Sequence, residues 1–295
     1  MKTKLTTIAR GGNVRLNKLI DLRLAGRPAF GVFSSTLAPR TAAALASAPL
    51  DFVIVDLEHS PFDPTRLETY LLAMTDKRRI LEKGTLQPDV VPLVRLPVSG
   101  REQLLYVVKQ VLDLGPLGLI VPQVESADEA RWFVQASRYP QRGGVADFEP
   151  EGIRGVGYGW PARQWGLSGE EYARRADLWP LDPEGELVLW TMIETRRGLD
   201  HCEEIARTPG VHGLFIGPSD LAFSLGVPLG DPAVERAIRR IALACRKAGV
   251  ALGTLATADE VPRRLRQGFG FLALGSDTGL TADAAEALRR GRKGK

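Results

Sequence analysis

Eight short apolar runs recur along the chain, and longer amphipathic stretches separate them. Short β-branched or apolar runs predict buried strands, whereas apolar residues repeated every three to four positions predict helices with one face on a core. The predicted strands are residues 29–33, 52–56, 91–95, 118–121, 187–193, 213–216, 250–255 and 271–274. Eight βα units in one chain favour a closed barrel over an open doubly wound sheet. We therefore expect an α/β protein with a (β/α)8 TIM barrel.

Helices are predicted between these strands, and two long segments interrupt the repeat. The predicted helices are residues 40–48, 65–74, 101–113, 127–137, 198–207, 232–248 and 258–267. The chain has 295 residues, a length at which barrels commonly form one domain, so we expect a single domain over 1–295. Segments 76–89 and 139–183 are insertions into the repeat, and connections of that length are usually functional lids or partner contacts.

Composition excludes several classes of protein. The chain is 44% hydrophobic and 25% charged, as in soluble globular proteins. Residues 1–15 are polar and basic, and no apolar run approaches the roughly 20 residues of a membrane span. Cys202 and Cys245 lack zinc-finger spacing, so we interpret them as buried reduced thiols. A cytoplasmic enzyme without membrane contact is the expectation.

The positive charge does not indicate a nucleic-acid partner. The formal net charge is +4 and the pI is about 9.2. Much of the excess lies in the basic tail 289–295, which we expect to be solvated. Other basic pairs, such as Arg239-Arg240, are scattered among acids and are not interleaved with aromatic residues. Nucleic-acid binding is therefore disfavoured.

Barrel active sites form at the carboxyl ends of the strands, so the residues found there are candidates for chemistry. Five predicted strand ends carry polar groups: Asp56 to His59, Arg95, Glu194, Gly217 to Asp220, and Gly275 to Asp277.

Glu194 and Asp220 occupy equivalent ends of adjacent predicted strands, so their carboxylates can converge. Such oxygen ligands suit Mg²⁺ or Mn²⁺, with water or substrate oxygens completing an octahedron. The alternative, which the spacing supports equally, is that each carboxylate caps the following helix. For Asp56 and Glu58, capping or loop hydrogen bonding is the favoured role.

His59 follows an acidic pair at a strand end, where an imidazole is a useful acid or base. His201 and His212 lie at a helix start and before a strand, and we expect both to be structural. Arg95 closes an apolar run, so its guanidinium is a candidate clamp for a carboxylate or enolate. An ion pair with Glu58 or Asp56 is the alternative for Arg95.

Six motifs in order resemble those of the HpcH/HpaI aldolase family over most of residues 29–280. The motifs are DFVIVDLEHSP at 51–61, VPLVRLP at 91–97, VLDLG at 111–115, MIETRRGLD at 192–200, FIGPSDLAFSLG at 215–226 and FLALGSDT at 271–278. The resemblance implies metal-dependent (class II) aldolases of 2-oxo acids on a barrel of the pyruvate/phosphoenolpyruvate type. It also implies homohexamers, as trimers of dimers, whose last helix packs on a neighbouring subunit.

Carried over by position, the resemblance implies a role for each motif residue. Glu194 and Asp220 become the ligands of Mg²⁺ or Mn²⁺, with Co²⁺ as a further option, and Arg95 holds the enolate of pyruvate. His59 becomes the acid or base, with Asp113 as the residue that orients it. The implied contacts to the 2-oxo acid are Arg95, Met192, Gly217, Pro218 and Ser219.

Asp113 raises a geometric difficulty. It ends the helix before the fourth strand, so it belongs at the amino-terminal rim, a strand length of roughly 15 Å from His59. Either Asp113 is a structural helix-end residue, or it serves the His59 of an adjacent subunit. We favour the second hypothesis, which requires an oligomer.

The sequence also departs from the family pattern. Met192 stands where many of these aldolases have Gln, and residues 149–157 resemble the RG-containing loop of the family only at their end. These departures leave the acceptor aldehyde open, while Trp160, Trp165 and Trp179 are expected to be packing residues or subunit anchors.

Two other functions are alternatives to an aldolase. An acyl-CoA ester lyase of the citrate lyase β-subunit type would also use a metal and two carboxylates, but the LEH and GPSDL motifs fit aldolases better. A nonenzymatic binding protein leaves the strand-end residues unexplained.

Overall fold

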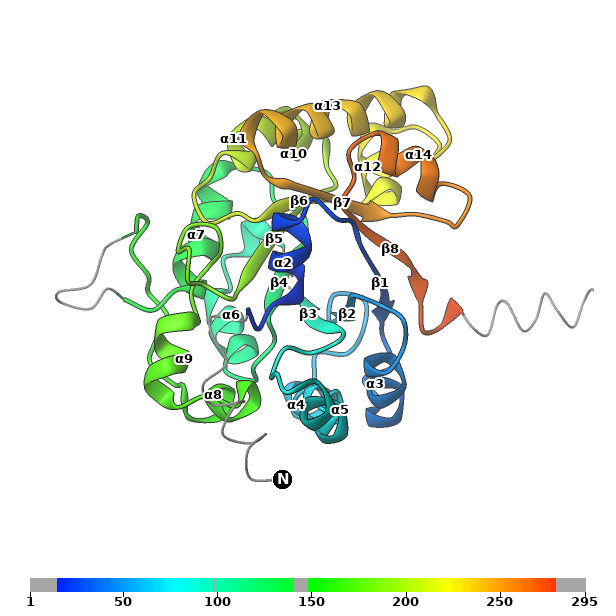
Figure 1. Ribbon diagram of the computed structural model, residues 1–295. Coiled ribbons are helices and arrows are strands. Elements are labelled where there is room, and N and C mark those ends of the chain that lie inside the picture. Colours follow the sequence, from blue (N-terminus) through cyan, green and yellow to red (C-terminus); the bar gives the residue numbers. More distant parts are fainter. Residues whose placement is uncertain (1–14, 98, 141–147, 280–295) are drawn as a thin grey trace, which may run out of the picture.

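Eight parallel strands close into a barrel in chain order, with β8 hydrogen-bonded to β1 (Figure 1). The computed structural model describes residues 15–97, 99–140 and 148–279. The strands are β1 (Ala29–Ser34), β2 (Phe52–Asp56), β3 (Val91–Arg95), β4 (Gly118–Val121), β5 (Val188–Ile193), β6 (Gly213–Ile216), β7 (Ala251–Leu255) and β8 (Phe271–Ser276). The predicted (β/α)8 barrel is confirmed, and each strand begins and ends within two residues of its predicted bounds.

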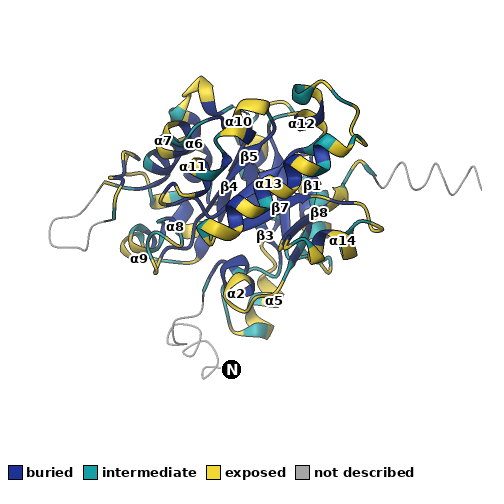
Figure 2. Ribbon diagram, turned by 90° about the horizontal axis from the view of Figure 1, so that it is seen from above, coloured by how far each residue is buried: buried dark blue, intermediate teal, exposed yellow. Residues whose placement is uncertain are grey.

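Helices surround the barrel and turn their buried faces toward the strands (Figure 2). They are α2 (Lys18–Leu24), α3 (Pro39–Ala46), α4 (Pro64–Ala73), α5 (Lys77–Lys83), η1 (Gly100–Glu102), α6 (Leu105–Leu112), α7 (Ala127–Ser137), α8 (Gly159–Trp165), α9 (Gly169–Arg175), α10 (Arg196–Asp200), α11 (Cys202–Ala206), α12 (Pro218–Leu225), α13 (Pro232–Ala248) and α14 (Val261–Arg266). The longest of these, α13, buries Val234, Ile238 and Ile241 and exposes its arginines.

Two segments that were predicted as single helices are each divided. Gln103 adopts a left-handed conformation (φ 53°) between η1 and α6, so the continuous helix predicted over 101–113 is wrong. His201 leaves the helical conformation between α10 and α11, and its Nδ1 lies 2.9 Å from the carbonyl oxygen of Glu125. In each segment the apolar periodicity of the sequence continues, but the backbone conformation of a single residue ends the first helix.

The two insertions contain helices of their own. Segment 76–89 holds α5, which Asp76 caps at its amino end and Gly84 ends at φ 70°. Segment 139–183 holds α8 and α9, and the capping box of Ser168 and Glu171 begins α9. A helix of seven residues has only about two turns, too few for its apolar periodicity to be recognised in the sequence. The stability of such short helices depends on packing against the rest of the protein.

Five aromatic rings fill the interior of the barrel. Phe271 stacks on Phe52 (ring centroids 3.8 Å apart) and on Trp190 (4.3 Å), and it meets the edge of Phe215 at 6.1 Å. Phe215 in turn meets Phe33 at 6.2 Å. Side chains alternate along a strand, so residues two positions further along face the same interior above these rings. These five rings, here called the aromatic floor, therefore fill the barrel beneath the residues at the carboxyl ends of the strands.

The amino-terminal end of the barrel is covered by α2, which lies in front of the strands in Figure 1. Asn17, which caps α2, donates from Nδ2 to the carbonyl oxygens of Leu117 and Glu186, both at 2.9 Å. Leu117 and Glu186 lie just before β4 and β5, so this contact fixes α2 across that end.

Several smaller expectations have also been tested. No helix in the described ranges is long and apolar enough to cross a membrane. Cys202 and Cys245 are free and buried, as expected. The basic tail 289–295 lies outside the described residues.

His212 is buried between two indole rings at the amino-terminal side of β6. Its ring lies 4.9 Å from that of Trp190 and 5.3 Å from that of Trp179. Burial lowers the pKa of His212 from 6.5 to about 3. The unfolded chain therefore binds a proton between these values that the folded chain does not, and the stability that neutral His212 contributes is present above pH 6.5 and lost as the pH falls toward 3.

We expect His212→Phe to flatten the acid limb of the stability profile, because Phe fits the aromatic site and binds no proton. Urea unfolding of both proteins between pH 7 and pH 4 measures this, and the slopes should differ by an amount that accumulates to a few kcal/mol. Identical pH slopes in the two proteins would contradict the assignment of His212 as a buried neutral side chain.

Candidate active site

A buried arginine and two carboxylates meet at the carboxyl ends of β2 and β3. Arg95 donates from Nε to Asp56 Oδ1 at 2.9 Å and from Nη2 to Asp56 Oδ2 at 2.8 Å. Its Nη1 lies 2.8 Å from Glu58 Oε2. Asp56 and Arg95 are register partners in adjacent strands, which places both side chains on the same face. The ion pair that the sequence left as an alternative for Arg95 is therefore present.

The electrostatics of this cluster are uneven. Burial opposes the charge of Arg95, but hydrogen bonding to Asp56 and the charges of Asp56 and Glu58 outweigh it and raise the pKa of Arg95. Burial raises the pKa of Glu58 and outweighs the attraction of Arg95. The Arg95 guanidinium carbon lies 4.9 Å from the centre of the Phe33 ring, at the top of the aromatic floor. A guanidinium carries five N–H groups, so Nη1 and Nη2 each keep one for a further anion.

Glu194 lies buried at the end of β5, with 2% of its surface exposed. Its Oε2 accepts a hydrogen bond from the backbone N–H of Gln123 at 3.0 Å. The cap of α10 is Thr195, whose side chain accepts from Gly198, so the capping alternative is wrong for Glu194. A Cβ atom at Gly217 would lie 2.2 Å from Glu194 Oε1, so only glycine leaves room for this carboxylate.

Asp220 is exposed in the first turn of α12. Its negative charge acts on the Glu194 carboxylate. The amino end of α12 has no side-chain cap hydrogen bond, so the structure gives Asp220 no capping role. Burial, together with the negative charges of Glu58 and Asp220, raises the pKa of Glu194 to about 8 against the opposing hydrogen bond from Gln123. The mouth of the barrel therefore carries more negative charge than Arg95 balances.

The donor set of this site fits a divalent cation of the Mg²⁺ type. Among the described residues there is no group of three or more His, Cys, Asp or Glu side chains arranged to hold a metal. Glu194 and Asp220 can supply two carboxylate ligands, and Mg²⁺ commonly keeps several waters and uses only one or two protein carboxylates. A cation would also offset the repulsion that raises the pKa of Glu194.

His59 lies in the loop beyond β2, on the open side of the cluster. Its side chain is 66% exposed, and its Nε2 lies 3.7 Å from Glu58 Oε2. The backbone N–H of Glu58 donates to Asp56 Oδ1 at 3.1 Å, and that of His59 donates to the same oxygen at the longer distance of 3.5 Å. Asp56 therefore has the loop-bonding role expected of it and also binds Arg95.

Asp113 lies at the opposite end of the barrel. It is the residue that ends α6, and its Oδ1 accepts from Arg154 Nη2 at 2.9 Å. Asp113 therefore lies far from the His59 of its own chain, and its position in the sequence had indicated this separation.

The remaining sequence candidates lie around Glu194 or seal the barrel. Met192 is buried on β5, two residues before Glu194 and on the same face. Gly217, Pro218 and Ser219 form the start of α12. Asp277 accepts hydrogen bonds from the β1 side chain of Ser34 and from the backbone of Ser35 and Thr36, so it ties β8 to β1 and is structural.

Sequence reasoning missed Gln123. It holds Glu194 through its backbone, at a left-handed φ of 48°, just beyond β4. The available signal was its position: Gln123 is the polar residue two places after the predicted fourth strand, in VPQ.

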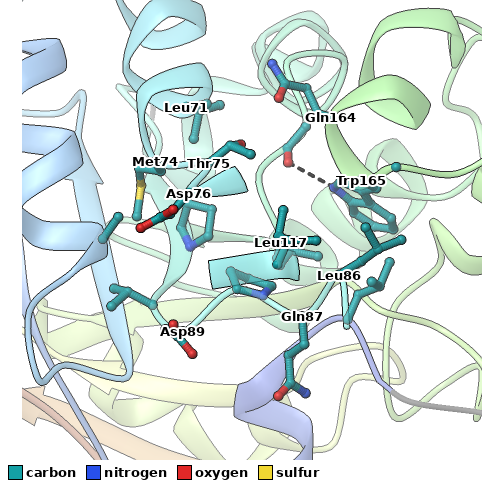
Figure 3. A pocket seen from close by; sticks show the side chains of 18 of the residues that line it. Leu71, Met74, Thr75, Asp76, Leu86, Gln87, Asp89, Leu117, Gln164 and Trp165 are labelled. Carbon is teal, nitrogen blue, oxygen red and sulfur yellow. Dashed lines mark hydrogen bonds between the residues drawn. The ribbon is translucent and has the colours of Figure 1, made fainter. Parts of the chain in front are cut away.

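A separate hollow lies on the other side of the molecule. It is bounded by Met74 on one side and by Leu86 and Trp165 on the other, with Leu117 between them (Figure 3). Leu117 precedes β4, so this hollow opens near the amino-terminal rim and contains none of the strand-end residues described above.

Comparison with known proteins identifies relatives along nearly the whole chain. Residues 29–284 match the family described as HpcH/HpaI aldolase/citrate lyase. A hydroxypyruvate/pyruvate aldolase from Deinococcus radiodurans is 36% identical over 278 residues, 92% of this chain and 87% of that protein. A 4-hydroxy-2-oxo-heptane-1,7-dioate aldolase from Shigella sonnei is 35% identical and covers 90% of each chain. A solved HpcH/HpaI family structure from Burkholderia cenocepacia has a TM-score of 0.76 at 30% identity, covering 94% of this chain and 99% of that one.

Proposed function

Because this chain belongs to the HpcH/HpaI aldolase/citrate lyase family, we propose that it is a divalent-metal-dependent aldolase of 4-hydroxy-2-oxo acids. The substrates are pyruvate or a related 2-oxo acid and an aldehyde, the class that the names of the Deinococcus and Shigella relatives indicate. The observation that carries the proposal is the buried Glu194 carboxylate, with its pKa raised to about 8, beside Asp220 and the partly free guanidinium of Arg95. The relatives named as aldolases favour this activity over an acyl-CoA ester lyase.

The proposed roles follow from charge and position. Glu194 and Asp220 would hold the metal, which would act as a Lewis acid toward the ketone and carboxylate oxygens of the 2-oxo acid. Arg95, fixed by Asp56, would donate its remaining N–H groups to the enolate oxygen as negative charge develops there. Gly217, Pro218 and Ser219 would line the same space with backbone groups at the start of α12.

Cleavage requires a base on the aldehyde side. His59 would take the proton from the C4 hydroxyl, the C3–C4 bond would break, and its electron pair would pass into the enolate while the aldehyde leaves. A proton returned to C3 then gives the 2-oxo acid. The exposure of His59 suits this role, because the acceptor enters from the open side of the site.

An oligomer would complete the site. The Asp113 of a neighbouring subunit would orient His59, since the Asp113 of the same chain lies at the opposite rim. A homohexamer, as a trimer of dimers, is the assembly we propose on the family resemblance. Two free buried thiols are consistent with the reducing cytoplasm as its location.

The direct test is a substrate panel. Pyruvate and hydroxypyruvate are each offered with a series of aldehydes in the presence of Mg²⁺, Mn²⁺ or Co²⁺. Metal-dependent formation of 4-hydroxy-2-oxo acids supports the proposal, whereas turnover of CoA esters without aldol activity would replace it.

We expect excess EDTA to abolish aldol cleavage while the circular dichroism spectrum stays that of the folded barrel. The metal contributes to the reaction and to the local charge balance, whereas the barrel is held by its own core. Full activity in excess EDTA rules out metal dependence.

Gly217→Ala probes the same site without removing a ligand. Its Cβ would displace the Glu194 carboxylate, so Mn²⁺ affinity should fall by about 10–100-fold, as for other changes that misplace a ligand. Gly230→Ala is the matched control, because a Cβ there meets nothing within 4 Å. Isothermal titration with Mn²⁺ measures the affinity of each variant. Equal Mn²⁺ affinities in Gly217→Ala and Gly230→Ala would show that Glu194 does not bind the metal.

Arg95→Ala and His59→Ala should separate the two halves of the reaction. Loss of Arg95 should reduce both cleavage and exchange of the pyruvate methyl protons by about 10²-fold or more, because both need the enolate. Loss of His59 should impair cleavage more than exchange. Deuterium uptake followed by NMR measures the exchange, and Arg207→Ala, whose side chain at the end of α11 is 61% exposed, is the control. Equal losses in the His59 variant contradict this division.

Mixing two inactive variants tests the shared site. Oligomers assembled from His59→Ala and Asp113→Ala subunits contain some sites with an intact His59 from one chain and an intact Asp113 from another. Activity of verified mixed oligomers should exceed the sum of the parents. If it does not, Asp113 acts within its own chain or is structural.

A further inference from the structure

The Asp113 carboxylate is held by a wholly buried arginine. Arg154 Nη2 donates to Asp113 Oδ1 at 2.9 Å and to the Tyr172 hydroxyl at 3.2 Å. The side chain of Arg154 has 0% of its surface exposed, whereas that of Asp113 has 30%. The pair thus has one end sealed inside the protein and one end facing outward.

Two neutral tyrosines enclose the guanidinium. Its central carbon lies 4.5 Å from the centre of the Tyr139 ring and 5.9 Å from that of Tyr172. Burial raises the pKa of both tyrosines, so neither carries a charge near neutral pH. In the described part of the chain, Arg154 forms an ion pair with Asp113 alone, and this carboxylate therefore supplies its counter-charge.

This arrangement is a poor way to stabilise a fold. Nε and Nη1 of Arg154 are buried and have no hydrogen-bond partner among the described residues. Buried donors left unpaired oppose stability, and an apolar side chain in place of a buried ion pair often gives an equally stable protein. What Arg154 does achieve is to fix Asp113 Oδ1, which leaves Oδ2 as the oxygen available to another group.

The backbone around Arg154 is fitted to this position. Arg154 N–H donates to the carbonyl oxygen of Arg138 at 2.9 Å. A Cβ at Gly152 would lie 2.2 Å from the carbonyl oxygen of Tyr139, so glycine is required for this close approach. A Cβ at Gly157 would lie 3.0 Å from Asp113 Oδ2, so glycine also leaves that oxygen unobstructed.

Helices α8 and α9 complete the enclosure. Trp165 donates from Nε1 to the carbonyl oxygen of Gly115 at 2.9 Å, two residues after Asp113. The Trp165 ring also meets the edge of Tyr172 at 4.7 Å. Arg154, Gly157 and helices α8 and α9 of the 139–183 insertion therefore pack around the turn that carries Asp113.

We propose that Arg154 is a positioning residue that fixes Asp113 so that Oδ2 reaches the His59 of a neighbouring subunit. The described part of the 139–183 insertion is the scaffold of that contact. This inference rests on the proposed function, in which Asp113 serves a neighbouring site.

The experiment uses the full-length oligomer and the variant Arg154→Met, which keeps an apolar stem but removes the charge. Aldol cleavage should fall by about 10²-fold, because the base loses its oriented partner, while exchange of the pyruvate methyl protons stays within about twofold of wild type. Arg154→Lys should recover part of the cleavage rate. Arg207→Met, at an arginine that ends α11, is 61% exposed and lies outside this insertion, is the matched control and should keep both rates.

Two further measurements separate positioning from a general structural role. In an Asp113→Asn background, Arg154→Met should cause no further loss, because its effect passes through that carboxylate. In mixed oligomers, Arg154→Met should restore activity with His59→Ala but not with Asp113→Ala, because Arg154 and Asp113 must belong to one chain.

Equal losses of cleavage and exchange in Arg154→Met, or wild-type cleavage, overturn the proposal. If Arg154→Met does not assemble, Arg154→Lys and Gly157→Ala carry the same test, since the latter crowds Oδ2 alone and should reduce cleavage without reducing exchange. The two failures are distinguishable: wild-type protein without metal-dependent cleavage removes the proposed function itself, whereas active wild type with unaffected or uniformly impaired Arg154 variants removes only the role of Arg154.

Discussion

The balance of charge at the carboxyl ends of the strands is the constraint on which the site depends. Arg95 is bound on two sides by Asp56 and approached by Glu58, so its charge is already matched. Glu194 and Asp220 add further negative charge, and burial with this repulsion raises the pKa of Glu194 to about 8. Hard oxygen donors with excess negative charge suit a divalent cation. In the proposed aldolase chemistry, the cation that offsets this negative charge would also bind the oxygens of a 2-oxo acid.

Rigidity differs between the two sides of this site. Arg95 rests on the aromatic floor above Phe33, and Glu194 is fixed by the backbone of Gln123. These groups would handle the donor, whose enolate needs fixed charges. His59, in contrast, lies in an exposed loop, and among the described residues its one ion-pair partner is Glu58, with Nε2 and Oε2 3.7 Å apart. In the proposed oligomer, the Asp113 carboxylate that Arg154 fixes at the amino-terminal end of one barrel supplies the partner that this loop lacks.

Some of this arrangement was predictable because it depends on short-range periodicity. Buried parallel strands read as apolar runs of four to six residues, and their ends follow from where a polar residue stops the run, as Arg95 and Glu194 do. Short helices were less predictable. The left-handed Gln103 divides one helix. Helices α5, α8 and α9 have seven residues each, so their apolar periodicity is too brief to recognise, and their stability depends on packing.

The sequence by itself determined the barrel, the set of strand-end residues and the conflict between Asp113 and His59, because each depends on the order and spacing of residues along strands. Only the tertiary structure decided which partners those residues have. It assigned Arg95 to Asp56 and Glu58, freed Glu194 from capping, and tied Asp277 to the end of β1. It also enclosed Arg154 between Tyr139 and Tyr172 against Asp113, a contact across 41 positions of the chain. Such contacts depend on packing between distant segments, which local sequence patterns do not encode.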